Sequence, residues 1–121
     1  MANPVDTFFA AWGMSSDADR SAAISGCMTA SATYADPRSN GVLTGVEAIT
    51  TYVSMFSANA PGWSASVVKS DEIAGSHRVT VAFGGPGPDG AKITQYGQYF
   101  IDLNGAQIAR MVGFVGTGAP E

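Results

Sequence analysis

Apolar residues near the start of the chain recur at the spacing of an amphipathic helix. Asn3 is a helix-capping residue type, and Pro4 is favoured at the first position of a helix. The pattern predicts a helix that runs from this start to about Gly13 and packs an aromatic stripe against a core. Four bulky residues at the i, i+3, i+4 and i+7 positions make up this stripe: Val5, Phe8, Phe9 and Trp12.

Two further helices are predicted from their start signals. Ser16 is a capping residue ahead of acidic residues, and the helix that it opens should end near Ala30. Thr44 and Glu47 have the spacing of a capping box, and Pro61-Gly62 should end the helix that follows them. The residues expected on the buried faces of these two helices are Ile24, Cys27 and Met28, and then Val46, Ile49, Val53 and Phe56.

The second half of the chain changes to a period of two, which is typical of strands. The segment Gly84–Gly90 is rich in turn formers but lacks the Lys-Ser/Thr ending of a phosphate-binding loop, so we expect a hairpin loop there. Gly75-Ser76 and Asn104-Gly105 should form the other turns. Strands are predicted over residues 63–72, 77–83, 93–102 and 107–115.

Three helices followed by long antiparallel strands predict a single α+β domain over residues 1–121, with a loose tail at 116–121. We expect a curved antiparallel or mixed sheet that wraps around the three N-terminal helices and leaves a cone-shaped pocket. Gly97 and Gly113 fit bends in such a sheet, or positions of close packing. One strand face should mix bulky and hydrogen-bonding side chains: Thr94, Tyr96, Gln98 and Phe100.

Composition and charge exclude several classes of partner. The net charge is −4, and the six Lys and Arg residues are scattered, so nucleic acid is not an expected partner. Apolar runs fall far short of the roughly 20 residues that span a bilayer, and the start lacks the pattern of a signal peptide, so we expect a cytoplasmic protein with no membrane contact. Cys27 is the only cysteine, and its apolar neighbours indicate a core position.

Asp36 is the strongest candidate for acid or base chemistry. It lies in Tyr34-Ala35-Asp36-Pro37, which closes a short apolar run ahead of a loop and a new helix. A carboxylate at the mouth of an apolar cavity is partly desolvated and can exchange a proton near neutrality. The alternative is that Asp36 only forms an Asp-Pro turn.

The single histidine and three of the arginines are the other polar residues considered for the site. His77 is the only histidine, so we expect no metal site; it is a possible general base, or simply a residue at a strand end. Three arginines should pair with carboxylates such as Asp71, Glu72 or Asp102, although an anionic substrate is an alternative. They are Arg20, Arg78 and Arg110.

The order of the elements and several residues resemble the nuclear transport factor 2-like (NTF2-like) superfamily, with its SnoaL-like polyketide cyclase and ketosteroid isomerase branches. The resemblance spans nearly the whole chain and implies a cone fold, an apolar small-molecule ligand, no cofactor, and a homodimer formed through the sheet. The residues that carry it are Trp12, Asp17, Arg20, Tyr34-Ala35-Asp36-Pro37, Gly41, Gly45, His77-Arg78, Gly97 and Ile108 to Phe114.

The resemblance also implies roles for particular residues. Asp36 matches the isomerase aspartate that moves a proton between carbons, again just before a proline. Trp12 stands where the isomerases have a tyrosine that donates to an oxyanion, and Gln98 stands near their second donor and the cyclase aspartate. Since Gln98 cannot titrate and an indole is a poorer acid than a phenol, activity on a steroid is not expected.

Three functions follow as hypotheses. The first is an isomerase, cyclase or dehydratase in which Asp36 moves a proton while Trp12 and Gln98 orient an oxygen, with His77 as a secondary site residue. The second is a non-catalytic module for a small hydrophobic ligand, and the third is a protein interaction domain that uses the open sheet face. The residues expected to line the ligand pocket are Tyr34, Met55, Trp63, Val81, Phe83, Tyr96, Phe100 and Phe114.

Overall fold

The structure is a computed structural model that describes residues 3–39, 41–60, 62–87 and 89–115. Its three helices are α1 (Pro4–Ala11), α2 (Asp17–Cys27) and α3 (Val46–Asn59). Its strands are β1 (Met28–Ala35), β2 (Leu43–Thr44), β3 (Ser64–Ile73), β4 (Ser76–Pro86), β5 (Lys92–Asn104) and β6 (Gln107–Val115).

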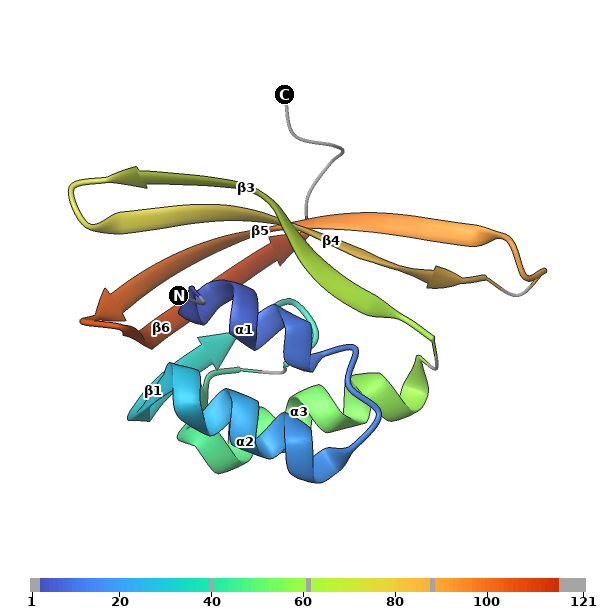
Figure 1. Ribbon diagram of the computed structural model, residues 1–121. Helices are drawn as coiled ribbons and strands as arrows, with labels where there is room; N and C mark the ends of the chain where they lie inside the picture. Colours follow the sequence, from blue (N-terminus) through green and yellow to red (C-terminus); the bar gives the residue numbers. More distant parts are fainter. Residues whose placement is uncertain (1–2, 40, 61, 88, 116–121) are drawn as a thin grey trace.

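The six strands form one curved, mixed sheet in the order β2-β1-β6-β5-β4-β3. Strands β1 and β6 pair in parallel, and every other neighbouring pair is antiparallel. All three helices lie against one face of this sheet, and no helix in the described ranges lies on the opposite face (Figure 1). The predicted α+β cone is therefore confirmed.

The core fills the space between the helices and the inner sheet face. Phe8 and Phe9 of α1 are fully buried, as the spacing of the aromatic stripe predicts. From the sheet, alternate residues such as Val79, Val81 and Ile101 point into the same core.

The first two helix starts form as predicted. The Asn3 side chain accepts a hydrogen bond of 2.8 Å from the backbone N–H of Val5, and Pro4 is the first residue of α1. The Ser16 side chain accepts from the N–H of Asp19 at the start of α2. These caps depend on neighbouring residues only, which is why the sequence predicts them well.

The capping box predicted at Thr44 and Glu47 is wrong. Gly45 is the N-cap of α3, with φ of 93° and no side-chain cap bond. Thr44 instead lies in β2, paired with Thr33 of β1. Gly45 suits this corner because glycine adopts a positive φ without strain.

The second helix ends earlier than predicted, because β1 begins at Met28. Met28 is buried, as expected, but from a strand rather than from a helix. Residues 29–34 include two threonines and a tyrosine, which favour extended backbone. Cys27, the last residue of α2, is buried in the core, and burial raises the pKa of its thiol to about 11.

The hairpin between β4 and β5 is shorter than predicted, because Gly84, Gly85 and Pro86 belong to β4. They pair with Thr94, Ile93 and Lys92 of β5. The loose tail predicted at 116–121 lies outside the described residues.

Two of the three arginine pairings are confirmed on the sheet. Arg78 lies 3.1 Å from Asp71, and Arg110 lies 3.8 Å from Asp102. Arg20 instead lies buried beside α1 and α3, where it contacts the carboxylate of Asp17.

Candidate functional site

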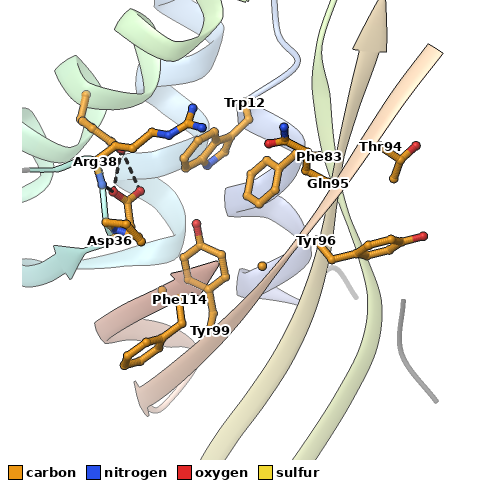
Figure 2. A pocket seen from close by; sticks show the side chains of 13 residues that line it. Trp12, Asp36, Arg38, Phe83, Thr94, Gln95, Tyr96, Tyr99 and Phe114 are labelled. Carbon is orange, nitrogen blue, oxygen red and sulfur yellow. Dashed lines mark hydrogen bonds between the residues drawn. The ribbon is translucent and has the colours of Figure 1, made fainter. Parts of the chain in front are cut away.

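A cavity of about 490 Å³ opens between the helices and the inner face of the sheet. Its volume lies within the range of small-molecule pockets, roughly 300–1,000 Å³. Six of the thirteen lining residues are aromatic, and Asp36, Arg38, Thr94 and Gln95 add polar groups to the wall (Figure 2). The lining residues are Trp12, Asp36, Pro37, Arg38, Tyr52, Phe83, Thr94, Gln95, Tyr96, Gly97, Tyr99, Gly113 and Phe114.

Asp36 lies directly after β1, in a turn that fixes its carboxylate at the cavity wall. The backbone N–H of Arg38 donates to Oδ1 of Asp36 at 2.8 Å. The hydroxyl of Ser39 accepts from the N–H of Asp36 at 3.0 Å, and Ser39 is itself buried. This is the Asp-Pro turn that the sequence offers as an alternative, so turn formation and cavity lining coexist in one residue.

Two phenols also donate to Asp36. The hydroxyl of Tyr34 lies 2.7 Å from Oδ2, and the hydroxyl of Tyr52 lies 2.8 Å from both carboxylate oxygens. Tyr34 comes from β1 and Tyr52 from α3, so the carboxylate joins the sheet to the helix layer. Both carboxylate oxygens therefore already accept hydrogen bonds from the protein.

A third phenol extends this chain of hydrogen bonds. The hydroxyls of Tyr34 and Tyr99 lie 2.9 Å apart. Because a carboxylate only accepts, Tyr34 donates to Asp36, and Tyr99 then donates to Tyr34. The chain runs from Tyr99 on β5, through Tyr34, to Asp36.

All three phenols are held in their neutral form. Burial raises the pKa of Tyr34 well above its ordinary value, and the nearby Tyr99 and Asp36 act in the same direction. Burial also raises the pKa of Tyr52 and of Tyr99 above the usual range for tyrosine. They therefore act as hydrogen-bond donors near neutral pH.

Trp12 supplies an unused donor. The residue is only 3% exposed, and its indole Nε1 is buried with no hydrogen-bond partner among the residues that the structure describes. Its ring packs against Phe56 and Phe83, with ring centroids 4.8 and 5.4 Å away. A buried donor without a partner is costly, so this N–H would gain from an acceptor, which a bound molecule can supply only where the side chains around the indole move to admit it.

Arg38 and Gln95 add polar groups at the exposed side of the cavity. The Arg38 side chain extends from the Asp36 turn toward Trp12 (Figure 2). Within the described part of the chain, its guanidinium forms no hydrogen bond or ion pair, although its backbone N–H bonds Asp36. The cavity mouth thus carries a positive charge directed at the space that a ligand would fill.

Gly113 makes room for Tyr99. The two residues pair across β6 and β5, and a Cβ on Gly113 would collide with the Tyr99 ring at 2.5 Å. The register shifts of the sheet lie at other residues, so Gly113 serves close packing rather than a bulge. Only glycine lets the Tyr99 ring lie flat against this strand and reach Tyr34.

Solved structures share this arrangement of helices and sheet. A proposed isomerase of the SnoaL-like family from Agrobacterium tumefaciens superposes with a TM-score of 0.79 at 21% identity, over 94% of this chain and 95% of that chain. The chain has the NTF2-like fold. No protein-family model matches the sequence, and no curated protein matches it either.

Two other solved structures are similar in fold. A protein with a ketosteroid isomerase-like fold from Catenulispora acidiphila, solved with trimethylamine, has a TM-score of 0.76 at 16% identity, over 96% of this chain and 87% of that chain. A proposed SnoaL-like polyketide cyclase from a Jannaschia species has a TM-score of 0.71 at 16% identity, over 93% of this chain and 84% of that chain. At these identities the likeness establishes the fold.

Five of the residues predicted from the sequence line the cavity of this NTF2-like cone. In Figure 2, the rings of Trp12 and Phe83 lie on the inner side of the sheet, whereas the Tyr96 side chain points away from them. Tyr96 therefore contributes mainly the base of its side chain to the wall. The five are Asp36, Trp12, Phe83, Tyr96 and Phe114.

Gln98 and Phe100 lie on the outer face of the sheet and are not among the lining residues. Gln98 pairs with Thr80 and accepts a hydrogen bond of 3.0 Å from its hydroxyl. Phe100 is 47% exposed and packs edge-on against Phe114. The inner position of this strand belongs to Tyr99, one residue away, since alternate strand residues face opposite sides.

Five other predicted residues also lie outside the lining of the cavity. Val81 and Tyr34 are fully buried in the core, although Tyr34 reaches the site through its hydroxyl. Met55 is exposed on α3, and the Trp63 indole donates to the carbonyl of Pro86. His77 lies near the start of β4, paired with Glu72 and Ile101.

Sequence reasoning missed Tyr52, Arg38 and Gln95 as site residues. A signal for Tyr52 existed, because it lies three residues after Ile49 and four before Phe56 on the buried face of α3. Arg38 gave no signal, since it depends on how the turn after Pro37 directs the chain.

Metal ligands do not gather in this structure: among the described residues, no three of His, Cys, Asp and Glu lie close enough to hold an ion. Of the helices in the described ranges, none has the length and apolar character needed to cross a bilayer.

Proposed function

We propose that this protein binds a small, largely apolar carbonyl compound in its cavity and uses Asp36 to move a proton next to that carbonyl. The observation that carries the proposal is a carboxylate fixed at the wall of a 490 Å³ aromatic cavity by two phenols and a backbone N–H. Isomerases, cyclases and dehydratases share this first step. The names of the SnoaL-like and ketosteroid isomerase-like neighbours support this class.

The chemistry uses two groups on one cavity. Asp36 takes a proton from the carbon beside the carbonyl; the C–H electron pair becomes a carbon–carbon double bond, and the carbonyl π electrons move onto the oxygen to give an enolate. The Trp12 N–H, which has no protein partner among the described residues, donates to that oxygen. Asp36 then returns the proton to a different carbon, or a leaving group departs.

Tyr34 and Tyr52 orient the carboxylate in this scheme. They hold both oxygens in one plane against the turn, so the carboxylate does not rotate away from the cavity. Fixed geometry of this kind lowers the cost of reaching the reactive arrangement.

The test is deuterium exchange into small cyclic ketones and aromatic polyketides, followed by proton NMR with wild type and Asp36→Asn. Loss of a general base typically lowers the rate by about 10²–10⁴-fold. Asp102→Asn, the same change on the outer face, is the matched control. Equal exchange by wild type and Asp36→Asn would exclude the proposed chemistry.

A second function is favoured by one observation. Asp36 is the one carboxylate among the residues described around the cavity, and both of its oxygens are occupied by donors from the protein. A non-catalytic module that holds an apolar ligand needs no more than this. Ligand binding that is equal in wild type and Asp36→Asn, with no exchange in either, would support it.

We also propose that two copies pair through the outer sheet face. Within the described ranges that face carries no helix, and Phe100 and Phe114 stand on it with exposures of 47% and 55%. Their ring centroids lie 5.8 Å apart, so they form one apolar patch. Exposed aromatic pairs of this kind are typical of the centre of an interface.

A further inference from the structure

The cavity has unused hydrogen-bond donors and a fully used acceptor. Both oxygens of Asp36 accept bonds from Tyr34, Tyr52 and the backbone of Arg38. By contrast, within the described part of the chain neither the indole N–H of Trp12 nor the Arg38 guanidinium has a hydrogen-bond partner. A molecule that completes these bonds must bring acceptors rather than donors.

We propose that the ligand of this cavity is an acidic one: a planar apolar ring system with a carboxylate or an equally delocalised oxyanion. The inference deepens the proposed function and rests on it for the choice of site. It names the charge and chemical class of the molecule that enters.

Arg38 supplies the reason for a planar anion. A guanidinium presents parallel N–H groups that match the two oxygens of a carboxylate, which an ammonium of lysine does not. The Arg38 side chain extends toward Trp12 along the cavity (Figure 2), so an anionic group bound by its guanidinium lies on the Trp12 side of the cavity. The charge is exposed in the free protein, so binding an anion here does not require breaking an ion pair within the described residues.

The aromatic wall supplies the reason for a flat ring. Trp12, Tyr52, Phe83 and Tyr99 surround the cavity with ring surfaces. Such surfaces also attract alkylated ammonium ions, which makes a cation the competing class. The Asp36 carboxylate lines the same cavity and favours a cation, but both of its oxygens already accept hydrogen bonds from the protein. The Arg38 guanidinium has no partner among the described residues and attracts an anion, which decides for the anionic class.

The experiment uses three probes that share one ring and differ in charge: naphthoate, naphthamide and naphthylmethylammonium. Calorimetric titration at low salt should give about tenfold tighter binding for naphthoate than for naphthamide, with the ammonium weakest. Arg38→Gln should remove the preference for naphthoate. Arg110→Gln, which removes an exposed arginine from the outer face, should keep it.

A second measurement reports on Trp12 directly. The chain has two tryptophans, and the Trp63 indole already donates to Pro86. In a nitrogen–proton correlation spectrum, naphthoate should shift the Trp12 indole signal and leave that of Trp63 in place, with Trp63→Phe giving the assignment.

The outcomes separate this inference from the proposed function. Equal or tighter binding of naphthamide or the ammonium, an unchanged preference in Arg38→Gln, or no binding of any probe would overturn the anionic class. Preference for naphthoate without any Asp36-dependent proton exchange would keep the anionic class and refute the catalysis. Asp36-dependent proton exchange together with a preference for naphthamide would support the catalysis and refute the anionic class of ligand.

Discussion

The hydroxyl of Tyr34 donates a 2.7 Å hydrogen bond to Oδ2 of Asp36, two residues further along the chain. Residues i and i+2 of an extended segment point to the same side, so the phenol and the carboxylate meet on the inner face of the sheet. Tyr99 joins them from β5 at 2.9 Å. The short-range bond between Tyr34 and Asp36 is thus joined by a bond from Tyr99, which lies 65 residues after Tyr34 in the sequence.

Removing the Tyr34 hydroxyl should destabilise the fold and not only the site. Tyr34→Phe leaves the buried Tyr99 hydroxyl without its partner and takes one donor from Asp36, so we expect a loss of about 1–3 kcal/mol in the free energy of unfolding. Urea unfolding measures this, with Tyr96→Phe as a control on a half-buried phenol that has no such bond in the described residues.

The double variant Tyr34→Phe/Tyr99→Phe should lower the free energy of unfolding by less than the sum of the two single changes, because both ends of one bond are removed together. Simple additivity would mean that the two hydroxyls are not coupled.

The neutral phenols predict a loss of stability in alkali. Burial raises the folded-state pKa of Tyr34, Tyr52 and Tyr99 above the unfolded value of about 10. Their contribution to stability is therefore complete below that pH and is lost as the pH rises toward the folded-state pKa. The melting temperature should fall steeply above about pH 10. Tyrosinate absorbance in the folded protein should also stay well below that of all four tyrosines until unfolding. Full ionisation with the fold intact would contradict the buried network.

Local signals in the sequence predicted the helices and the position of Asp36. Asn3 and Ser16 cap the first two helices through bonds to residues two and three positions away. Asp36 likewise follows from its own short segment, Tyr34 to Pro37. In each case the deciding contacts lie within a few residues, so the chain itself carries the information.

Contacts between strands far apart in sequence determine which face of β5 meets the cavity, and the sequence pattern alone does not predict this. Strand β5 has bulky residues on both faces, with Tyr96 and Phe100 outside and Tyr99 inside, so a period of two could not tell which set meets the cavity. The choice is fixed by Gly113 on β6, which leaves space for the Tyr99 ring. The error at Gln98 has this same cause, since Gln98 is the outward neighbour of Tyr99.

Arg20 is predicted to position Trp12. Its Nε donates to the carbonyl of Ala11 at 3.1 Å, and its guanidinium also donates to the carbonyl of Met14, so it holds the chain on both sides of Trp12. It also donates to the hydroxyl of Ser57 on α3 at 2.8 Å.

Arg20→Met should therefore cost about 3 kcal/mol of unfolding free energy, because buried carbonyls lose their donor. Trp12 fluorescence in a Trp63→Phe background should shift to the red as its ring becomes wetter. Asp17→Asn tests the ion pair alone, and its exposed side chain predicts a change of less than about 1 kcal/mol. If the Trp12 fluorescence emission in Arg20→Met stays at the wild-type wavelength, Arg20 does not position Trp12.

The outer sheet face should hold two copies together through Phe100 and Phe114. A stable pair would bury about 800 Å² from each copy. Phe100→Glu places a charge at the centre of this patch and should convert a dimer to a monomer, as measured by size-exclusion chromatography with light scattering. Val42→Glu is the matched control, because Val42 is 67% exposed in the loop before β2, the edge strand that two strands separate from β5 in the sheet. A wild-type protein that is monomeric at all concentrations would refute the pairing. A dimer that survives Phe100→Glu would place the interface elsewhere. Since Phe114 also lines the cavity, dissociation should change probe binding as well, which links the outer face to the site.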